Sequence, residues 1–356
     1  MFLSFFAKPQ KYLGIDIGTF SIKIVELSYS KKGIFLENYG EKINEIRESQ
    51  IDNTLEKKIF LLSEEDTANS IKEILGALKI ETKKAVFSIP DFMSFFTIFN
   101  IPLVPKEDID STVRFQAKQH IPLPLEKTSL DWLVIREEEN RGKKELKILM
   151  VAVPNNIMIK YQKVARLAGI ESFSVEAEVF SLARALTKKD NQNKVIQLID
   201  IGIQSTTITI SENNRIKSTY SINFSNGKNI RGLADLLNIS YNEAEKMIEK
   251  RGIDDSETKE FFKERIDNLV MESNKVSDSF FKQEKKKIDK IIFSGGLPVI
   301  PGFLNYFIKK TGKDVSIAQP FSDINYPPSL NNIIQELGAR YSVAIGLALR
   351  NINIKK

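Results

Sequence analysis

Hydrophobic and polar residues follow each other along this chain with two different spacings. Short apolar runs bounded by glycine, proline or charged residues predict strands, and longer stretches with apolar residues three and four positions apart predict helices. Strands are expected at 12–17, 20–27, 33–38, 85–89, 95–101, 130–135, 146–153, 195–200, 205–210, 216–222 and 290–294. Helices are expected at 66–79, 106–119, 155–168, 178–188, 228–237, 240–250, 256–286, 301–311 and 337–351. This mixture predicts an α/β protein with mixed sheets.

The pattern contains one internal echo, between LGIDIGTFSIKI at 13–24 and LIDIGIQSTTITI at 198–210. Each segment is a buried strand that ends in Asp, a turn through Gly, and a second strand that carries hydroxyl groups. The matched pairs are Asp16 with Asp200, Gly18 with Gly202, Ser21 with Ser205, and Lys23 with Thr207. Two such hairpins far apart in the sequence indicate two similarly folded halves that face each other. The alternative is chance, because Asp-Ile-Gly is a common tripeptide at strand ends.

Composition narrows the class of protein. The 356 residues are 42% hydrophobic and 28% charged, which is typical of a soluble globular protein with one or two sizeable cores. Lys and Arg outnumber Asp and Glu by 52 to 46, a surplus too small and too spread out to indicate a nucleic-acid binder. The chain has no Cys and a single His, so the sequence supports neither a disulfide framework, a His/Cys metal cluster nor a hydrolase triad.

The first eleven residues, MFLSFFAKPQK, are apolar and then basic. They are too short for a secretory signal, and no run elsewhere approaches the ~20 apolar residues of a spanning helix. We expect Phe2, Phe5 and Phe6 to dock on the body of the protein. A weak contact with a membrane surface is the alternative.

The residues of the two hairpins fit a phosphate site. Glycine lets a ligand approach the backbone closely, and the N–H groups of a tight turn form a concavity for phosphate oxygens. Hydroxyl groups donate to the same oxygens, and an amine adds positive charge. The expected phosphate contacts are Gly18, Thr19, Ser21, Lys23, Gly202, Ser205 and Thr206. For Lys23 the alternative is an outward position, since Ile22 and Ile24 bury the other face of the strand.

Asp16 and Asp200 end the first strand of each hairpin, where a carboxylate by itself would repel phosphate. A cation removes that repulsion, and Mg²⁺ bound through water to one or two carboxylates fits the need. The alternative is that each Asp caps a turn. Further along, IIFSGGLPVIPGF at 291–303 is a strand followed by a double-Gly turn, and Gly295 and Gly296 let the chain lie flat against a base or ribose.

These motifs resemble the actin-like ATPase superfamily over nearly the whole chain. EAEVFSLARAL at 176–186 and GARYSVAIGLALR at 338–350 are similar to its two connecting helices. Within the superfamily, GIDIGTFSIKIVEL, RFQAKQHIPLPLEKTSLDW (114–132) and the stretch 151–186 resemble the type IV pilus assembly protein PilM family. The resemblance implies an actin-like ATPase fold with two lobes, each a mixed β-sheet with flanking helices, and an inserted subdomain of the kind found in FtsA.

The resemblance also implies a division of the chain. The first lobe would comprise 11–90, 154–193 and 336–356, the inserted subdomain 91–153, the second lobe 194–222 and 288–335, and a helical subdomain 223–287. It implies ATP and Mg²⁺ in the cleft between the lobes. Adenosine contacts are expected at Gly227, Lys228, Glu245, Gly295 and Gly296. Glu178, at the start of the first connecting helix, would position the attacking water. The alternative is a simple acid near a helix N-terminus, where the helix dipole favours a negative charge.

The partners follow from the same resemblance. The N-terminal cytoplasmic peptide of the membrane protein PilN would bind beside the inserted subdomain. Other proteins of the pilus platform, the assembly ATPase and further copies of the chain would be additional contacts, with no nucleic acid. The chain would then lie in the cytoplasm, on the inner face of the inner membrane, held there only through partners. The expected function is a pilus-assembly adaptor and at most a slow ATPase. The alternatives are an FtsA-like division filament and a sugar kinase.

The sequence departs from the family pattern at three places. Ile248 replaces the Lys that usually touches the adenosine. Val179 follows Glu178 where Pro usually starts the connecting helix. Asn226 and Gly227 stand where two glycines are usual, and Asn-Gly still suits a turn.

Overall fold

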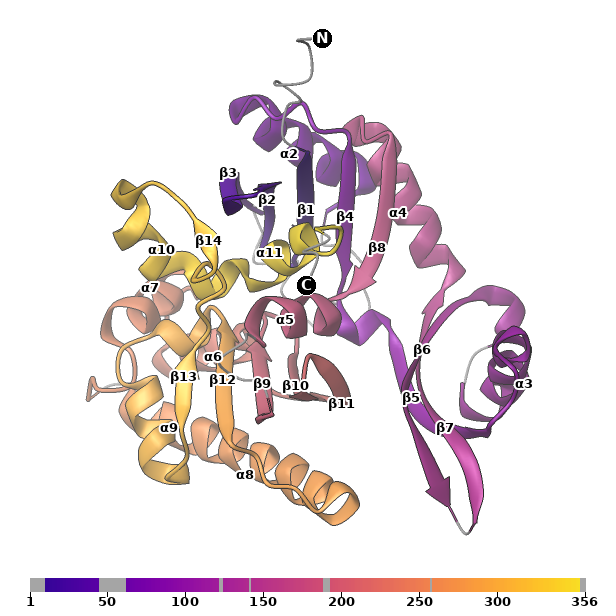
Figure 1. Ribbon diagram of the computed structural model, residues 1–356. Helices are drawn as coiled ribbons and strands as arrows, with labels where there is room; N and C mark the ends of the chain where they lie inside the picture. The colour runs from indigo at the N-terminus through magenta and orange to yellow at the C-terminus, as the bar shows by residue number, and fades with distance from the viewer. Residues whose placement is uncertain are drawn as a thin grey trace.

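The computed structural model describes residues 10–44, 62–121, 124–140, 142–187, 193–256 and 258–352. Within these ranges the strands form three sheets, each with its own helices (Figure 1). The expected docking of Phe2, Phe5 and Phe6 lies outside the described residues. No helix among the described residues is both long enough and apolar enough to cross a membrane.

The first lobe is built on a six-stranded sheet in the order β14-β3-β2-β1-β4-β8. Its strands are β1 (Lys11–Ile17), β2 (Ser21–Ser30), β3 (Gly33–Ile43), β4 (Lys84–Ile89), β8 (Ser172–Ala177) and β14 (Ile324–Asn325). β1, β2 and β3 are antiparallel, whereas β4 runs parallel to β1 and β8 parallel to β4. Its helices are α2 (Glu64–Ala77), α4 (Asn155–Ala168), α5 (Glu178–Leu186) and α11 (Ser342–Leu349).

Helices cover both faces of this sheet, so β1 is buried almost throughout. α11 contacts β1, β2 and β4, and it also crosses α5 (Figure 1). Two glycines make these contacts close. A Cβ at Gly14 would come within 2.1 Å of the Ala344 carbonyl oxygen, and a Cβ at Gly346 within 2.0 Å of the Ser181 carbonyl oxygen. Only glycine allows backbones to approach this closely.

The second lobe is built on a five-stranded sheet in the order β11-β10-β9-β12-β13. Its strands are β9 (Val195–Ile201), β10 (Thr206–Glu212), β11 (Arg215–Ile222), β12 (Lys290–Gly295) and β13 (Val315–Ile317). Its helices are α6 (Asn226–Leu237), α7 (Tyr241–Arg251), α8 (Lys259–Glu284) and α9 (Phe303–Thr311). The core is separate from that of the first lobe, and in it Phe293 packs edge-on against Phe303 and Phe307.

A small unit projects from the first lobe (Figure 1). It consists of a three-stranded antiparallel sheet, β5-β7-β6, and one helix, and it has a third core around Ile101, Val113 and Ile148. Its elements are β5 (Phe95–Pro102), α3 (Ile109–His120), β6 (Thr128–Asn140) and β7 (Lys143–Pro154). The chain enters the small unit from β4 through Pro90 and leaves it for α4 at Pro154.

Every strand and helix expected from the hydrophobic pattern is present, but some elements were missed. β8 is a short strand, SFSVEA, that is half-buried along most of its length; its polar and apolar residues alternate, so the strand signal was present and was missed. β13 and β14 are very short. The helix expected at 337–351 is a 3₁₀ turn (Gly338–Tyr341) followed by α11, and α10 (Asn331–Leu337), which comes before it, was missed. β14, which falls within the segment expected in the second lobe, pairs with β3 of the first sheet.

Candidate functional site

A cleft of about 1040 Å³ lies between the two lobes. Both hairpins of the internal echo line it, together with the turn after β12, one side of α7 and residues of the segment 317–343. A cavity of this size is at the upper end of the range for small-molecule sites. The cleft therefore has room for a ligand as large as a nucleotide and is bordered by the residues that the sequence singled out.

The two hairpins have the same local geometry. The Gly18 amide donates to the Ser21 carbonyl oxygen at 3.1 Å, and the Gly202 amide donates to the Ser205 carbonyl oxygen at 3.0 Å. A Cβ on either glycine would lie 3.0 Å from that same oxygen. The register also matches, because Asp16 pairs with Lys23 as Asp200 pairs with Thr207. The echo in the sequence is thus an echo in structure, and chance is excluded as its explanation.

An asparagine holds the tip of each hairpin. The Asn44 side chain donates to the Thr19 carbonyl oxygen at 2.9 Å, and the Asn226 backbone amide donates to the Gly202 carbonyl oxygen at 2.9 Å. Fixed turns of this kind keep their other backbone N–H groups in place for a ligand.

Lys23 lies in the cleft and not on the outer face of the sheet, with only 11% of its side chain exposed. Its Nζ donates to Ser21 Oγ at 2.7 Å and lies 3.7 Å from Glu41 Oε1. Glu41 also accepts from Arg340 Nη2 at 3.1 Å. One carboxylate therefore partly neutralises two cations that border the cleft.

Three carboxyl groups border the cleft, those of Asp16, Glu178 and Asp200. A fourth, Asp91, does not border it but interacts electrostatically with Glu178 and Asp200. Asp16 accepts a hydrogen bond from Ser88 Oγ at 2.8 Å, yet burial raises its pKa. Burial, with the Asp16 charge, raises the pKa of Asp200 to about 6. Burial raises the pKa of Glu178 well above its usual range, and the charge of Asp91 adds to that effect.

These raised pKa values show that the cleft disfavours so many negative charges, and a cation would relieve that repulsion. Within the described ranges no three or more His, Cys, Asp or Glu side chains are grouped so that they could hold a metal ion directly. Mg²⁺ usually keeps several waters and takes only one or two carboxylates. The carboxyl groups present thus fit a water-bridged Mg²⁺ better than a direct metal cage.

Asp91 is a residue that the sequence reasoning missed. It opens the 3₁₀ turn Asp91–Met93 after β4, is 5% exposed, and accepts the Val179 amide at 3.3 Å. Burial raises its pKa to about 7, with the Asp200 charge as a further cause. No local motif in the sequence marks it, and its place follows from the pairing of strands. The strand before Asp91 is parallel to β1, so the carboxyl ends of both strands meet at the same edge of the sheet.

Most of the predicted site residues do border the cleft. They are Asp16, Gly18, Thr19, Ser21, Lys23, Glu178, Asp200, Gly202, Ser205, Glu245, Gly295 and Gly296. Gly295 has φ +94°, and a Cβ there would meet the Ile201 carbonyl oxygen at 2.2 Å, so the turn requires glycine. Ile248, the departure from the family pattern, is 2% exposed and forms part of the apolar wall near Glu245.

Three predicted residues do not border the cleft. Thr206 is fully buried, and the neighbouring Thr207 borders the cleft instead because side chains alternate along a strand. Gly227 packs against the Ile203 carbonyl oxygen, to which its amide donates at 3.0 Å. The Lys228 side chain contacts Asn223 Oδ1. Gly227 and Lys228 therefore support the second hairpin from behind and do not border the space for a ligand.

Comparisons with known proteins agree with this arrangement. A family model described as type IV pilus assembly protein PilM matches residues 14–352. A solved structure of a PilM-PilN type IV pilus biogenesis complex has a TM-score of 0.81 at 19% identity, covering 96% of this chain and 99% of that chain. The ethanolamine utilization protein EutJ from Carboxydothermus hydrogenoformans has a TM-score of 0.55 at 15% identity, covering 96% and 90%. The expected actin-like ATPase fold is confirmed.

Proposed function

Because this chain belongs to the PilM family of type IV pilus assembly proteins, as its motifs indicated, we propose that it is an ATP-binding adaptor of the pilus assembly platform. A role in type IV pilus assembly follows from family membership. The proposal adds that ATP and Mg²⁺ bind in the cleft, that the partner is the N-terminal cytoplasmic peptide of PilN, and that nucleotide state affects that contact. It places the chain at the inner face of the inner membrane, held there by its partners.

The observation that carries the ATP proposal is the pair of matching hairpins on opposite sides of one cleft. Their fixed glycine turns offer backbone N–H groups to phosphate oxygens from two sides. Ser21 and Ser205 add hydroxyl donors, and Lys23 adds a positive charge. Mg²⁺, when bound, neutralises phosphate charge, and Asp16 and Asp200 would hold its waters. Thr207 takes the role that was expected of Thr206.

Hydrolysis is expected to be slow. Glu178 borders the cleft at the start of α5, where it can position a water. However, burial and the neighbouring carboxyl groups raise its pKa well above the usual range, which disfavours the charged form that a general base needs. Binding of ATP, and not its turnover, would then determine the state of the protein. A ligand that contacts both lobes favours the state in which the lobes are closed.

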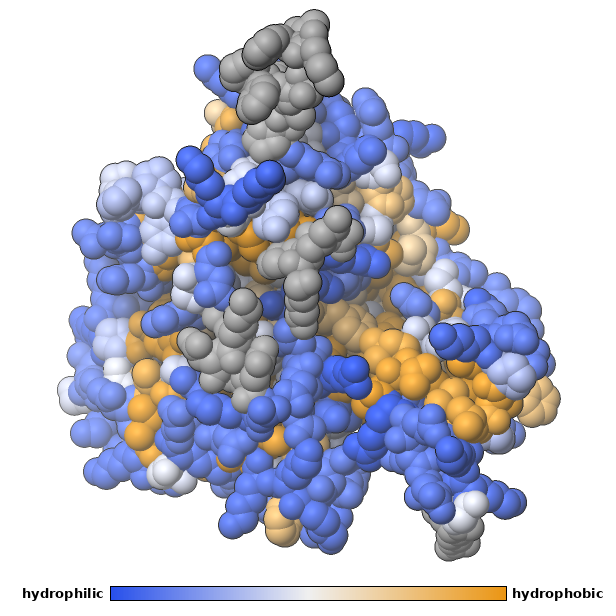
Figure 2. Space-filling model, in the orientation of Figure 1, coloured by the Kyte–Doolittle hydropathy of each residue, from blue (hydrophilic) through white to orange (hydrophobic). Residues whose placement is uncertain are grey.

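The proposed peptide site is on the small unit. Figure 2 shows hydrophobic residues gathered over the strands of the small unit. Among the exposed large hydrophobic residues of this unit are Val134 on β6, Leu103 after β5 and Phe115 on α3. β5 and β6 are the edge strands of its sheet. Edge strands and apolar surface together suit capture of an extended peptide through main-chain bonds and side-chain pockets. The solved structure with the same fold is of a PilM-PilN complex, which supports this choice of partner.

Two measurements test the proposal. ATP with Mg²⁺ should raise the melting temperature of the wild-type chain, and Asp16→Ala or Asp200→Ala should abolish that shift. Asp235→Ala, at an exposed position on α6, is the matched control and should keep it. A shift that persists in both cleft variants would contradict the assignment of the cleft. Separately, a fluorescent PilN N-terminal peptide should bind the wild-type chain saturably, and an absence of binding would contradict the adaptor role.

A further inference from the structure

Three successive carbonyl groups at the tip of the first hairpin bond to one residue, Asn44, which directly follows β3. Its side-chain Nδ2 donates to the Gly18 carbonyl oxygen at 3.3 Å and to the Thr19 carbonyl oxygen at 2.9 Å. Its backbone amide donates to the Phe20 carbonyl oxygen at 2.8 Å. Asn44 is 7% exposed, and its Oδ1 accepts no hydrogen bond from the described residues. The described hydrogen bonds of this side chain therefore all go to the turn.

The second hairpin is held at the matching carbonyl groups, but by a helix. The backbone amides of Asn226 and Gly227, the first two residues of α6, donate to the carbonyl oxygens of Gly202 and Ile203 at 2.9 and 3.0 Å. A Cβ at Gly227 would lie 2.6 Å from the Ile203 carbonyl oxygen, so the helix can approach this closely only with glycine there. One side-chain amide, that of Asn44, thus does in the first lobe what two backbone amides do in the second.

These bonds also fix the direction of the N–H groups that follow. In a trans peptide the carbonyl and the next N–H lie in one plane and point in opposite directions. Because the carbonyl groups are held toward Asn44, the N–H groups of Thr19 and Phe20 point away from it. The N–H groups of Ile203 and Gln204 point away from α6 for the same reason. All four of these residues border the cleft, whereas Asn44 does not.

We infer that Asn44 is a positioning residue of the phosphate site. It holds the carbonyl oxygens of the first hairpin away from the ligand, so that the N–H groups of Thr19 and Phe20 meet the phosphate oxygens. A carbonyl oxygen carries partial negative charge and would repel phosphate if the turn reversed. The support is one side chain and not a helix, so a single substitution removes most of it. This inference rests on the proposed function for its ligand, ATP.

Asn44→Leu tests the inference, because leucine is close in size to asparagine, lacks a donor and adds no charge. It should lower the affinity for ATP with Mg²⁺ by about tenfold or more, since bonds from N–H groups to phosphate are charge-assisted. The affinity for adenosine, which has no phosphate, should stay unchanged. Calorimetric titration measures both affinities. Asn44→Ala is the second variant, for use if the leucine prevents folding, and should give the same difference between the two ligands.

The matched control is Asn325→Leu. Asn325 is on β14 of the same sheet, and its Nδ2 donates to the Ile34 carbonyl oxygen at 2.9 Å, but it does not border the cleft. This variant loses a bond of the same kind and should keep the wild-type affinity for both ligands.

Asn226→Pro tests the support of the second hairpin. It removes the amide that holds the Gly202 carbonyl oxygen, at a helix position where proline is well accepted. The preceding Ser225 is extended, as a residue before proline prefers. Asn226→Ala loses the same side chain but keeps the amide, so it should bind ATP more tightly than Asn226→Pro. Equal affinities for ATP in these two variants overturn the inference that support of this kind serves the phosphates.

The nucleotide-free protein gives a separate test. Asn44→Leu should lower the backbone order parameters of the Thr19 and Phe20 amides, measured by ¹⁵N relaxation, and leave those of Ile203 and Gln204 as in wild type. The control variant should lower none of them.

Three results overturn the role of Asn44. They are unchanged order parameters at Thr19 and Phe20, an unchanged affinity for ATP, and an equal loss of affinity for ATP and adenosine. A wild-type chain that does not bind ATP contradicts the proposed function instead, and the order parameters without nucleotide still decide whether Asn44 positions the turn.

Discussion

The carboxylate of Asp91 accepts the backbone amide of Val179 at 3.3 Å, and this bond joins the turn after β4 to the first turn of α5. Asp91 therefore lies directly behind Glu178, the acid that borders the cleft. Its negative charge is one cause of the raised pKa of Glu178. The bond places a carboxyl group between the cleft and the entrance to the small unit.

Asp91→Asn should lower the pKa of Glu178, because it removes the charge and leaves an oxygen that can accept from Val179. The carboxyl ¹³C shift of Glu178, followed through a pH titration, measures this change. An unchanged pKa in Asp91→Asn would show that the two groups do not interact. Asp91→Ala removes the acceptor as well, and leaving the buried amide unpaired should cost about 1–3 kcal/mol of unfolding free energy.

The stability of the nucleotide-free protein should fall as the pH rises from about 4 to about 7. Asp91 and Asp200 have folded-state pKa values of about 7 and about 6, above the ~3.9 of an unfolded Asp. In that window the folded state holds protons that the unfolded state has lost, so rising pH favours unfolding. Urea denaturation at several pH values measures the slope. Asp91→Asn should reduce this slope by up to ~1.4 kcal/mol per pH unit, because it removes one titrating proton, and the exposed control Asp235→Asn should not.

Gly346→Ala should destabilise the fold, because its Cβ would come within 2.0 Å of the Ser181 carbonyl oxygen. Overpacking of this kind costs ~1–3 kcal/mol, and backbone cannot move aside as a side chain can. Gly76→Ala, in a helix with nothing within 4 Å of the new Cβ, is the control and should be neutral or stabilising. Equal unfolding free energies for the two variants would show that α11 and α5 tolerate a wider separation.

Glu41→Gln should tighten the binding of ATP by about tenfold, or ~1.4 kcal/mol. Glu41 lies near Lys23 and accepts from Arg340, so its removal frees positive charge for phosphate. Calorimetric titration with ATP and Mg²⁺ measures the affinity. Glu37→Gln on the same strand is the matched control, since Glu37 pairs with Lys11 and does not border the cleft. Weaker binding in Glu41→Gln would mean that Glu41 is needed to place Lys23.

Much of this structure was predictable because the two hairpins repeat both a hydrophobic pattern and a polar one. Asp16 and Gly18, and likewise Asp200 and Gly202, were identified from their two-residue spacing at the end of a strand, where a tight turn follows. Thr206, which the sequence singled out, does not border the cleft, whereas Thr207 does. The two hydroxyl groups lie on opposite faces of β10, and the register with β9 decides which of them reaches the cleft.

The remaining features depend on contacts that no local pattern encodes. Asp91 carries no motif, and its role comes from the parallel pairing of β4 with β1. Arg136 and Glu284 each read as ordinary charges on an exposed strand and at a helix end, and only the packing of β6 against β11 brings them together. β8 was missed although its residues, SFSVEA, alternate between polar and apolar as a half-buried strand does, because the run is only six residues long.

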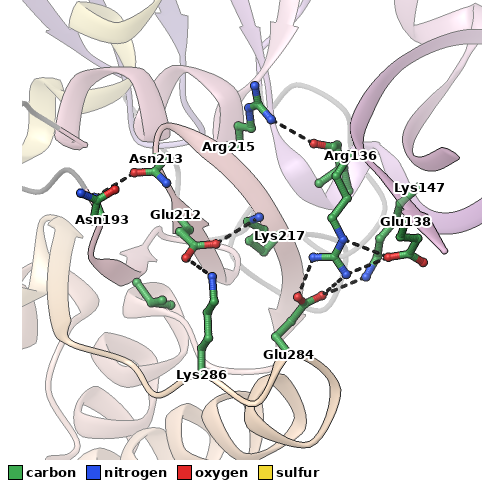
Figure 3. Close-up of polar contacts among 12 residues, drawn as sticks. Arg136, Glu138, Lys147, Asn193, Glu212, Asn213, Arg215, Lys217, Glu284 and Lys286 are labelled. Atoms are coloured by element: carbon green, nitrogen blue, oxygen red, sulfur yellow. Dashed lines mark hydrogen bonds and ion pairs between the residues drawn. The ribbon is translucent and has the colours of Figure 1, made fainter.

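The β-bulge at Ile135 of β6 provides a contact of the small unit with β11 and is not needed for the pairing of β6 with β7. Without Ile135, Val134 and Arg136 would follow each other on β6 as their partners Ile148 and Lys147 do on β7, so the ladder would become regular. The three-stranded sheet would keep its register and lose the hydrogen bond from Arg215 Nη1 to the Ile135 carbonyl oxygen (Figure 3). A change of one residue in strand length would thus remove one contact between β6 and β11, while the core of the small unit around Ile101, Val113 and Ile148 would stay as it is.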